Sequence, residues 1–348
     1  MKSISNANNQ ITFLGDVWTP KDSDISLPSS LSTNVIANLE APICTGRRNA
    51  PGKICIESDE SRFLQAFPMP PIAVCLANNH TFDFGDDGFE ETIGALERHD
   101  IAYFGAGSEV DNFNNPLRLR IEDQNVALMG YVCQSTNPAS GTGSYGAAPL
   151  ELERIQRDID SAKRADNCRV VISIHWGIEQ FWLPKPEDIK LAKSILHAGA
   201  DLIIGHHPHC VQPVWNHQNK KVFFSLGNAC FPDFNYLRPD GTVTRVVQRK
   251  WNRESLVVSY NPINNVADSQ MMKASNDGYE MLPVEAAQVN EWHGPPCNGN
   301  WVKYTRRLKY LSKLAAFRLM AYNFCDNPRV PSFKSLTYAI KKLTGRAD

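Results

Sequence analysis

Seven side chains of this sequence are of types that bind divalent metals or transfer protons, and they follow apolar segments far apart in the chain. Histidine nitrogens and carboxylate oxygens suit zinc, manganese and iron, and a carboxamide oxygen can complete such a site without adding charge. A carboxylate can bridge two ions, and two ions can activate water and hold both ends of an in-line displacement at phosphorus. The seven residues are Asp16, Glu40, Asn79, His80, His175, His207 and His209.

Each of these residues also has a structural interpretation when it is considered alone. An Asp after a strand commonly caps a turn or a helix, an Asn tolerates left-handed backbone, and a single buried histidine is commonly just hydrogen-bonded. Considered together, all seven lie at the carboxyl ends of expected strands, the edge along which open α/β sheets bind ligands. The joint arrangement therefore favours a site. An extended segment from His207 to His209 is expected to present both imidazoles on one side.

The segments that position these residues predict short strands alternating with helices. A pairing of Asp87 with Glu90 indicates a capping box at the start of the first helix, and Pro186 suits the first turn of the third. This alternation favours an α/β layered fold with a mixed sheet or two sheets. The expected strands are 11–16, 35–40, 72–79, 101–105, 169–177, 201–207 and 254–260, with hairpins over 117–132 and 211–226 and helices over 87–100, 150–167 and 186–200.

Composition narrows the class of protein. The net charge of −1 excludes a globally basic nucleic-acid binder, and no nucleic-acid partner is expected. The nine cysteines are odd in number and form no CxxC pair, so we expect reduced, mostly buried thiols rather than a disulfide framework or a cysteine zinc site. The N-terminus reads MKSISNANNQ, without an apolar leader, and the apolar runs are too short to span a bilayer. A cytoplasmic protein is expected.

The last 48 residues differ in character from the rest. Eleven residues of segment 301–348 are Lys or Arg and two are Asp. An apolar stripe with helical spacing indicates an amphipathic helix with a basic opposite face. Either this helix packs on the domain, or residues 303–322 lie on an anionic membrane surface. The stripe consists of Tyr304, Leu308, Leu311, Ala315, Leu319 and Tyr322.

The motifs resemble those of the poly-γ-glutamate capsule synthesis family (CapA-type), which looks like a branch of the calcineurin-like metallophosphoesterases. The resemblance covers roughly residues 11–231 and implies a four-layer αββα sandwich with a metal site at the strand ends. We expect this domain over 1–260, an irregular linker over 261–300 and a basic, helical extension over 301–348. The matching motifs are Gly15-Asp16, Asn38-Leu39-Glu40, Asn78-Asn79-His80 with Asp83, Gly105-Ala106-Gly107, His175-Trp176-Gly177 with Glu179, Gly205 to His209, and Ser225 to Asn228.

The resemblance also implies roles for the site residues. Two divalent ions (Mn, Zn or Fe) are expected, with Glu40 bridging them. His80 would act as general acid beside Asn79, and Glu179 either orients a ligand histidine or is a solvated turn residue. The ligands would be Asp16, Glu40 and His209 for the first ion, and Glu40, Asn79, His175 and His207 for the second.

Two departures from the pattern bear on function. Where metallophosphoesterases usually have Asp-x-His, this chain has Asp16-Val17-Trp18, so the first ion is expected to bind weakly. The bridging position is Glu40 rather than an Asp. One hypothesis is a metal-dependent hydrolase or transferase in capsule biosynthesis, acting on a phosphoester or amide-type bond of an anionic polymer or a polysaccharide. The other is a non-catalytic component of a polymer synthesis or export complex.

Overall fold

The computed structural model describes residues 2–4, 9–31, 34–45, 54–136, 144–237, 242–275, 278–281 and 291–292, with six further residues between 304 and 314. The chain divides into two compact units. The first comprises Met1–Pro232 and Arg249–Pro295, and the second comprises Asp233–Gln248 and Pro296–Asp348. All the candidate site residues belong to the first unit.

The first sheet contains a parallel centre flanked by antiparallel strands. Strands β8, β10, β11 and β13 are parallel, so their carboxyl ends share one edge. The expected hairpins are present as β7–β8 and β12–β13. The strand order is β1 (Lys2–Ile4), β7 (Leu117–Ile121), β8 (Gln124–Val132), β10 (Arg169–His175), β11 (Leu202–His206), β13 (Lys220–Phe223), β12 (Val214–His217) and β20 (Glu291–Trp292).

The second sheet is also mixed. Strands β2 to β5 are parallel, and β17 joins them antiparallel to β2. The order is β19 (Gly278–Met281), β18 (Val266–Ser275), β17 (Glu254–Asn261), β2 (Ile11–Val17), β3 (Val35–Leu39), β4 (Ala73–Cys75) and β5 (Ala102–Phe104), with β14 (Asn228–Cys230) also paired to β2. Two small antiparallel pairs lie outside these sheets: β6 (Ala106–Ser108) with β9 (Tyr145–Ala147), and β15 (Phe234–Leu237) with β16 (Val243–Val246).

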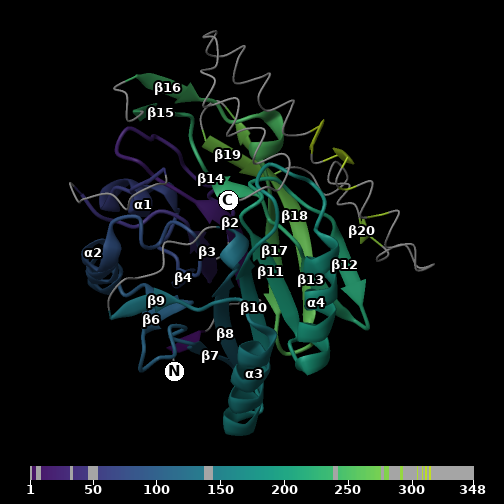
Figure 1. Cartoon of the computed structure of the whole chain (residues 1–348). Helices are drawn as coiled ribbons and strands as arrows, with labels where there is room; N and C mark the ends of the chain where they lie inside the picture. The colour runs from purple at the N-terminus through teal and green to yellow at the C-terminus, as the bar shows by residue number, and fades with distance from the viewer. Residues whose placement is uncertain are drawn as a thin grey trace. The chain divides into compact units, whose positions relative to one another are not determined.

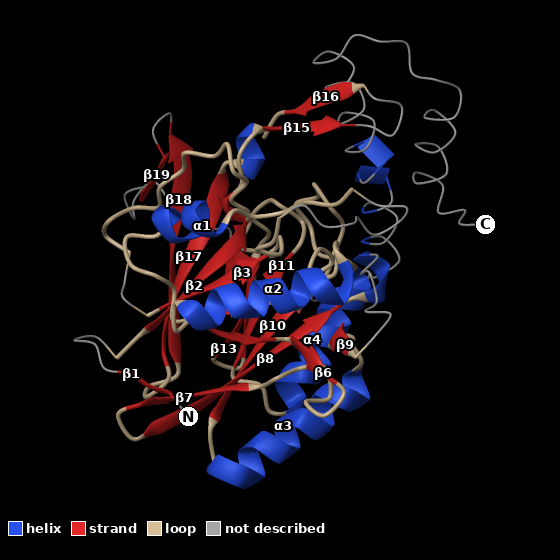
Figure 2. Ribbon diagram, turned by 90° about the vertical axis from the view of Figure 1, so that its left-hand side faces the viewer, coloured by secondary structure: helices blue, strands red, loops and turns tan. Residues whose placement is uncertain are grey.

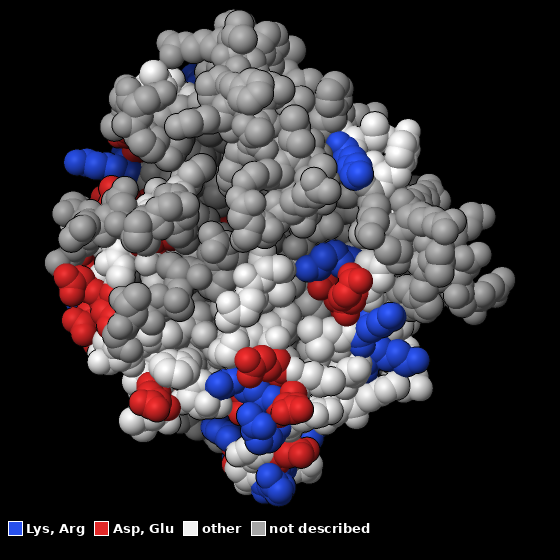
Figure 3. Space-filling view, in the orientation of Figure 1, with Lys and Arg blue, Asp and Glu red and all other residues white. Residues whose placement is uncertain are grey.

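The two sheets face each other and helices cover their outer faces. Phe13 and Ile36 of the second sheet share a buried cluster with Leu128 and Val171 of the first. Helices α1 (Glu60–Ala66) and α2 (Gly85–Arg98) pack on the second sheet, while α3 (Leu152–Asp166) and α4 (Pro186–Ala198) contact β10 and β11. Figures 1 and 2 show the two helix pairs on opposite sides. The four-layer αββα sandwich is therefore confirmed. Charged residues of both signs alternate around α3 in Figure 3.

Some elements differ from the sequence-based expectation. The strand expected over 72–79 ends at Cys75, because Leu76 onward forms a loop in which the Asn78 amide donates to the backbone oxygen of Leu39 at 2.8 Å. Helix α2 begins at Gly85 rather than Asp87, and Phe84 is its N-cap without any side-chain cap. The capping box expected at Asp87 is therefore wrong.

The segment 261–300, expected to be an irregular linker, contributes β18, β19 and β20 to the sheets. The sequence did not reveal β18 because it is a mostly polar strand, in which Ala267 and Met272 are buried. In the extension, the six described residues are helical, with Leu308 buried and Tyr310 and Leu314 exposed. This agrees with the expected stripe. The rest of the extension lies outside the described residues, and the domain boundaries stay a prediction.

Two further expectations concern thiols and membrane spans. Cys75, Cys168, Cys210 and Cys230 are reduced thiols, and burial raises the pKa of Cys75 to about 11. Such thiols are poor nucleophiles at neutral pH, since the thiolate is the reactive form. Among the described residues, no helix has the length and apolar character needed to cross a bilayer.

Candidate metal centre

Close contact between two backbone segments places the first candidate ligand. Asp16 lies in β2, opposite Asn228 of β14. A Cβ atom on the neighbouring Gly15 would lie 1.9 Å from the backbone oxygen of Gly227, so only glycine allows β14 to approach here. Glu40 follows β3 directly, and its backbone N–H donates to Val17 at 3.0 Å. Asp16, Glu40 and Asn228 therefore lie close together, near the carboxyl ends of β2 and β3 and at the start of β14.

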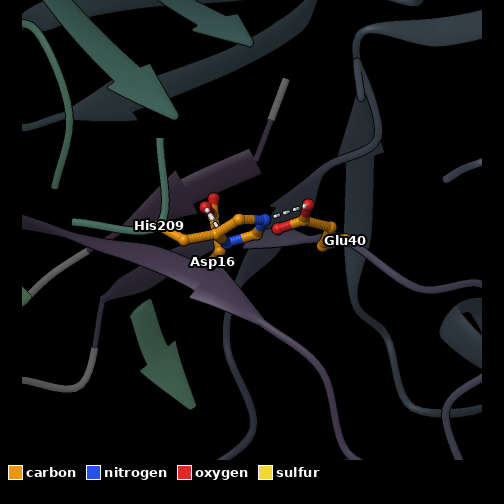
Figure 4. A group of neighbouring side chains, drawn as sticks. All are labelled: Asp16, Glu40 and His209. Carbon is orange, nitrogen blue, oxygen red and sulfur yellow. Dashed lines mark ion pairs between the residues drawn. The ribbon is translucent and has the colours of Figure 1, made fainter. Parts of the chain in front are cut away.

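The first cluster consists of Asp16, Glu40 and His209. One ligand-type atom from each residue lies within 4.8 Å of the other two. His209 Nδ1 is 3.4 Å from Oδ2 of Asp16, and His209 Nε2 is 3.4 Å from Oε1 of Glu40. Figure 4 shows the imidazole between the two carboxylates. All three residues are buried, so the structure brings together the ligands expected for the first ion.

Glu40 shows most clearly that the cluster fits a cation. Both of its carboxylate oxygens are buried, and neither has a hydrogen-bond partner among the described residues. Burial, reinforced by the charge of Asp16, raises the pKa of Glu40 well above its usual range, despite an opposite effect of His209. A buried carboxylate without hydrogen bonds is unfavourable unless a cation compensates it. A divalent ion with oxygen and nitrogen ligands matches this donor set.

The other two members of the cluster show the same electrostatic preference. Burial alone would raise the pKa of Asp16, but the hydrogen bonds and charges of His206 and His209 hold it well below its usual range. Burial also opposes protonation of His209, yet the charges of Glu40 and Asp16 raise its pKa to about 10. The two carboxylates thus favour positive charge between them.

The second cluster adjoins the first through Glu40. Nε2 of His175 lies 2.6 Å from Oδ1 of Asn79, 3.1 Å from Nδ1 of His207 and 4.0 Å from Oε1 of Glu40. Burial is the main cause of the lowered pKa of His175 and of His207. The pKa of His207 is lowered to about 3. Both imidazoles are therefore neutral, the form in which histidine binds metals. The structure brings together the four residues expected for the second ion.

The backbone of the histidine loop is not extended as expected. His207 and His209 both have left-handed φ values, of 95° and 54°. Residues other than glycine rarely adopt this conformation, and they cluster at sites where the surrounding structure holds them. The expectation of an extended segment is wrong because the loop bends after β11. The bend still directs His207 toward His175 and His209 toward Glu40.

His80 lies beside the clusters and is oriented by a carboxylate. Its Nδ1 is 2.7 Å from Oδ2 of Asp83, and its side chain is 14% exposed. Asp83 is itself buried and accepts a hydrogen bond from the backbone N–H of Ile56 at 2.8 Å. In sequence, His80 directly follows Asn79, which contacts His175 in the second cluster. The pairing with Asp83 leaves Nε2 of His80 to exchange a proton.

Glu179 is exposed on the loop that follows β10. Its charge contributes to raising the pKa of Glu40 and of His209. It therefore lies within electrostatic range of the clusters, and its role stays a prediction.

Three residues outside the expected ligand set contact the candidate ligands. The sequence suggests only that Asn228 lines the site or caps a turn, and it suggests no role for His206 or Asn38. Nδ1 of His206 is 3.2 Å from Oδ1 of Asp16, and the Asn38 amide donates to the same oxygen at 2.9 Å. Oδ1 of Asn228 is 2.8 Å from Nδ1 of His209. Such contacts orient ligands and fix histidine tautomers. All three lie inside the quoted motifs, but contacts across the sheets carry no signal in a single sequence.

The departure at Trp18 has a structural counterpart. Trp18 is buried, and its indole N–H donates to the backbone oxygen of Glu57 at 2.8 Å. Its ring also packs edge-on against Phe231. The side chain at this position is thus part of the core and offers no lone pair to an ion.

Comparison with known proteins agrees with the motifs. Residues 30–233, more than half of the chain, match the family described as "Bacterial capsule synthesis protein PGA_cap". The chain belongs to this family. The chain is 34% identical over 160 residues to "Capsule biosynthesis protein CapA" of Bacillus anthracis, covering 45% of this chain and 39% of that protein. It is 28% identical over 290 residues to "PGA biosynthesis protein CapA" of Bacillus subtilis (strain 168), covering 82% and 69%.

A third relative and one solved structure complete the comparison. The chain is 24% identical over 235 residues to the "Probable polyglutamine synthesis accessory protein" of Mycobacterium tuberculosis. This match covers 64% of this chain and 62% of that protein. The matches thus span less than two thirds of the Bacillus anthracis and Mycobacterium proteins. A 5'-nucleotidase precursor from Thermus thermophilus aligns with a TM-score of 0.40 and 12% identity, covering 90% of this chain and 59% of that chain. At this TM-score the similarity supports no conclusion about fold or activity.

Proposed function

We propose that this chain is a metal-dependent hydrolase or transferase that acts in the synthesis or processing of a capsule polymer, either poly-γ-glutamate or a polysaccharide. The observation that carries the proposal is the Glu40 carboxylate, buried without hydrogen bonds among the described residues and lying 3.4 Å from His209 and 4.0 Å from His175. Membership of the capsule synthesis family and the names of its relatives support the link to capsule.

Two divalent ions, of manganese, zinc or iron, fit the two clusters. When bound, such ions polarise a phosphoryl or carbonyl oxygen and lower the pKa of water. The first ion would bind more weakly, because Trp18 supplies no ligand. The ligands would be Asp16, Glu40 and His209 for the first ion, and Glu40, Asn79, His175 and His207 for the second.

The remaining chemistry belongs to side chains of this chain. Asp83 holds Nδ1 of His80, so that Nε2 can give a proton to a leaving group as the bond breaks. Asn79 contacts His175 through Oδ1 and keeps that ring in place. The substrate class is a phosphoester or amide-type bond in an anionic polymer. The charge of the exposed Glu179 carboxylate adds to those of Glu40 and Asp16 in favouring positive charge at the first cluster.

A second candidate function is a non-catalytic component of a polymer synthesis or export complex. The specific observation in its favour is Trp18, which replaces a usual ligand with a buried indole. In that case the same residues bind an anionic ligand or an ion without turning over a substrate.

The two functions are separated by metal content and turnover. The full chain is purified without chelators, its metal is counted, and hydrolysis of a generic phosphodiester and of a γ-glutamyl amide is followed with manganese, zinc or iron added. The enzyme proposal expects bound metal and turnover that a chelator abolishes. Bound metal without turnover of either substrate favours the binding component, and absence of both rejects the enzyme. Glu153→Gln, an exposed change on α3, serves as control.

A further inference from the structure

Asn252 is a buried residue whose side-chain amide forms hydrogen bonds to two nearby loops and to its own turn. It ends the short 3₁₀ turn η2 (Lys250–Asn252), and it is 2% exposed. Its Nδ2 donates to the backbone oxygen of His209 at 2.7 Å and to Oε1 of Gln180 at 2.6 Å. Its Oδ1 accepts from the backbone N–H of Arg249 at 3.1 Å. Each donor therefore ends on a different loop.

The two loops held by Asn252 carry candidate ligands. Gln180 lies in the connection from β10 to α4, five residues after His175, and His209 lies in the connection after β11. Gln180 and His209 are both left-handed, with φ of 58° and 54°. The loops also touch directly, since the Gln180 backbone N–H donates to Pro208 at 2.9 Å. Such conformations persist where neighbouring groups over-determine them, and Asn252 supplies two of these constraints.

Trp251 adds a second link from the same turn. Its indole N–H donates to Oε1 of Gln180 at 3.1 Å, the oxygen that also accepts from Asn252. The turn thus donates two hydrogen bonds to the Gln180 side chain and one to the His209 backbone oxygen. Both Trp251 and Asn252 lie beyond the matched family region, which ends at residue 233.

We propose that Asn252 is a positioning residue of the metal centre, which sets the orientation of the His209 imidazole by holding its backbone carbonyl. The inference rests on the proposed function only in taking His209 as a metal ligand. Without the amide, the His209 carbonyl and the Gln180 oxygen lose a buried donor, and the loop relaxes from its left-handed conformation. The imidazole then leaves its place between Asp16 and Glu40.

The test compares metal affinity and ring geometry in the full chain. Asn252→Asp keeps the size of the side chain and removes both donors, and manganese and zinc binding is followed by calorimetry. Residues that orient metal ligands typically contribute 10–100-fold to metal affinity, and a loss of about that size is expected. The thermal midpoint should also fall, because a buried carboxylate would face the two oxygens to which the Asn252 amide now donates. The signature of positioning is therefore a local change at His209. In metal-free protein, the nitrogen resonances of His209 in histidine-labelled samples should shift while those of His197 stay in place.

The control is Asn261→Asp, the same chemical change at the turn that ends β17, where Oδ1 accepts hydrogen bonds from the backbone N–H groups of Ile263 and Asn264. If Asn252→Asp does not fold, Asn252→Ala removes the donors without adding charge and is measured in the same way. Wild-type metal affinity together with unshifted His209 resonances in the folded variant overturns the positioning role. Absence of metal from the wild type, by contrast, overturns the proposed function as well.

Discussion

Nδ1 of His206 lies 3.2 Å from Oδ1 of Asp16, and this contact joins the first sheet to the second beside the candidate ligands. His206 stands opposite His175 in the register of β10 and β11. Asp16 also accepts from the Asn38 amide at 2.9 Å and from the backbone N–H of His207 at 3.3 Å. Residues from both sheets therefore fix the Asp16 carboxylate, and the cluster is built into the sandwich rather than placed on a mobile loop.

We expect opposite effects on stability from substitutions of two glycines, because Gly15 lies at the close contact between β2 and β14 and Gly94 does not. Gly15→Ala would place a Cβ atom 1.9 Å from the backbone oxygen of Gly227, so the strands must separate. Overpacking of this kind typically costs roughly 1–3 kcal/mol. Gly94→Ala in α2 meets only Arg98 at 3.6 Å, and should stabilise by about 0.5–1 kcal/mol. Urea unfolding of the two variants measures both signs, and equal stability of the two would contradict the close approach.

His80→Ala should keep the metal and lose rate. A general acid near the leaving group typically contributes about 10²–10⁴-fold, and Asp83 holds His80 for this role at 2.7 Å. The loss should shrink for substrates with good leaving groups, since these need little protonation. Metal content and turnover of a matched substrate series check this. An equal loss for good and poor leaving groups would show that His80 is structural or a ligand.

Asp188 predicts a pH dependence of stability away from the metal centre. Burial, only partly offset by Lys185 at 3.5 Å, raises the pKa of this carboxyl from 3.8 to about 6. A carboxyl with a raised folded pKa is favourable when protonated, and that contribution is lost as pH rises through about 6. Asp188→Asn should therefore be more stable than wild type at pH 7–8, by up to about 3 kcal/mol, and nearly equal to it at pH 4.

Thermal unfolding of wild type and Asp188→Asn across pH 4–8 measures this difference. Asp160→Asn, an exposed change on α3, is the control and should show no such trend. A stability difference that is the same at every pH would mean that Asp188 ionises normally.

The basic extension predicts membrane attachment in one of its two interpretations. In that interpretation, residues 303–322 lie on an anionic membrane surface, where each basic residue adds about 1 kcal/mol to binding. Sedimentation with vesicles containing anionic phospholipid compares the full chain with a truncation at residue 300. Salt-sensitive binding of the full chain alone supports attachment. Equal binding by both, or by neither, leaves the packed helix as the explanation.

The fold and the grouping of the candidate ligands could be predicted because their signals are local. Apolar runs marked most of the strands of the two sheets, and ligand-type residues at their ends marked Asp16, Glu40 and His175. The parts that were missed depend on contacts between distant segments. The His207 backbone reaches Asp16 across 191 residues, and the His209 carbonyl meets Asn252 across 43.

Local irregularity explains the remaining errors. The left-handed φ values at His207 and His209 are held by neighbouring loops, whereas residues other than glycine usually adopt negative φ. The early start of α2 at Gly85 follows from the turn that brings Asp83 to His80. The spacing of hydrophobic residues predicts neither feature, because it shows which face of a helix or strand is buried and does not show where the helix or strand ends.

The bridging role of Glu40 is the central claim, and metal stoichiometry tests it most directly. Glu40→Gln keeps the shape of the side chain but removes the carboxylate that faces both His209 and His175. The variant and the wild type are loaded with manganese or zinc, desalted and analysed for metal per chain, with Glu153→Gln as control. The account predicts that the wild type and the control retain metal, and that Glu40→Gln loses more of it than His175→Ala or His207→Ala. Wild-type stoichiometry in Glu40→Gln would contradict the account.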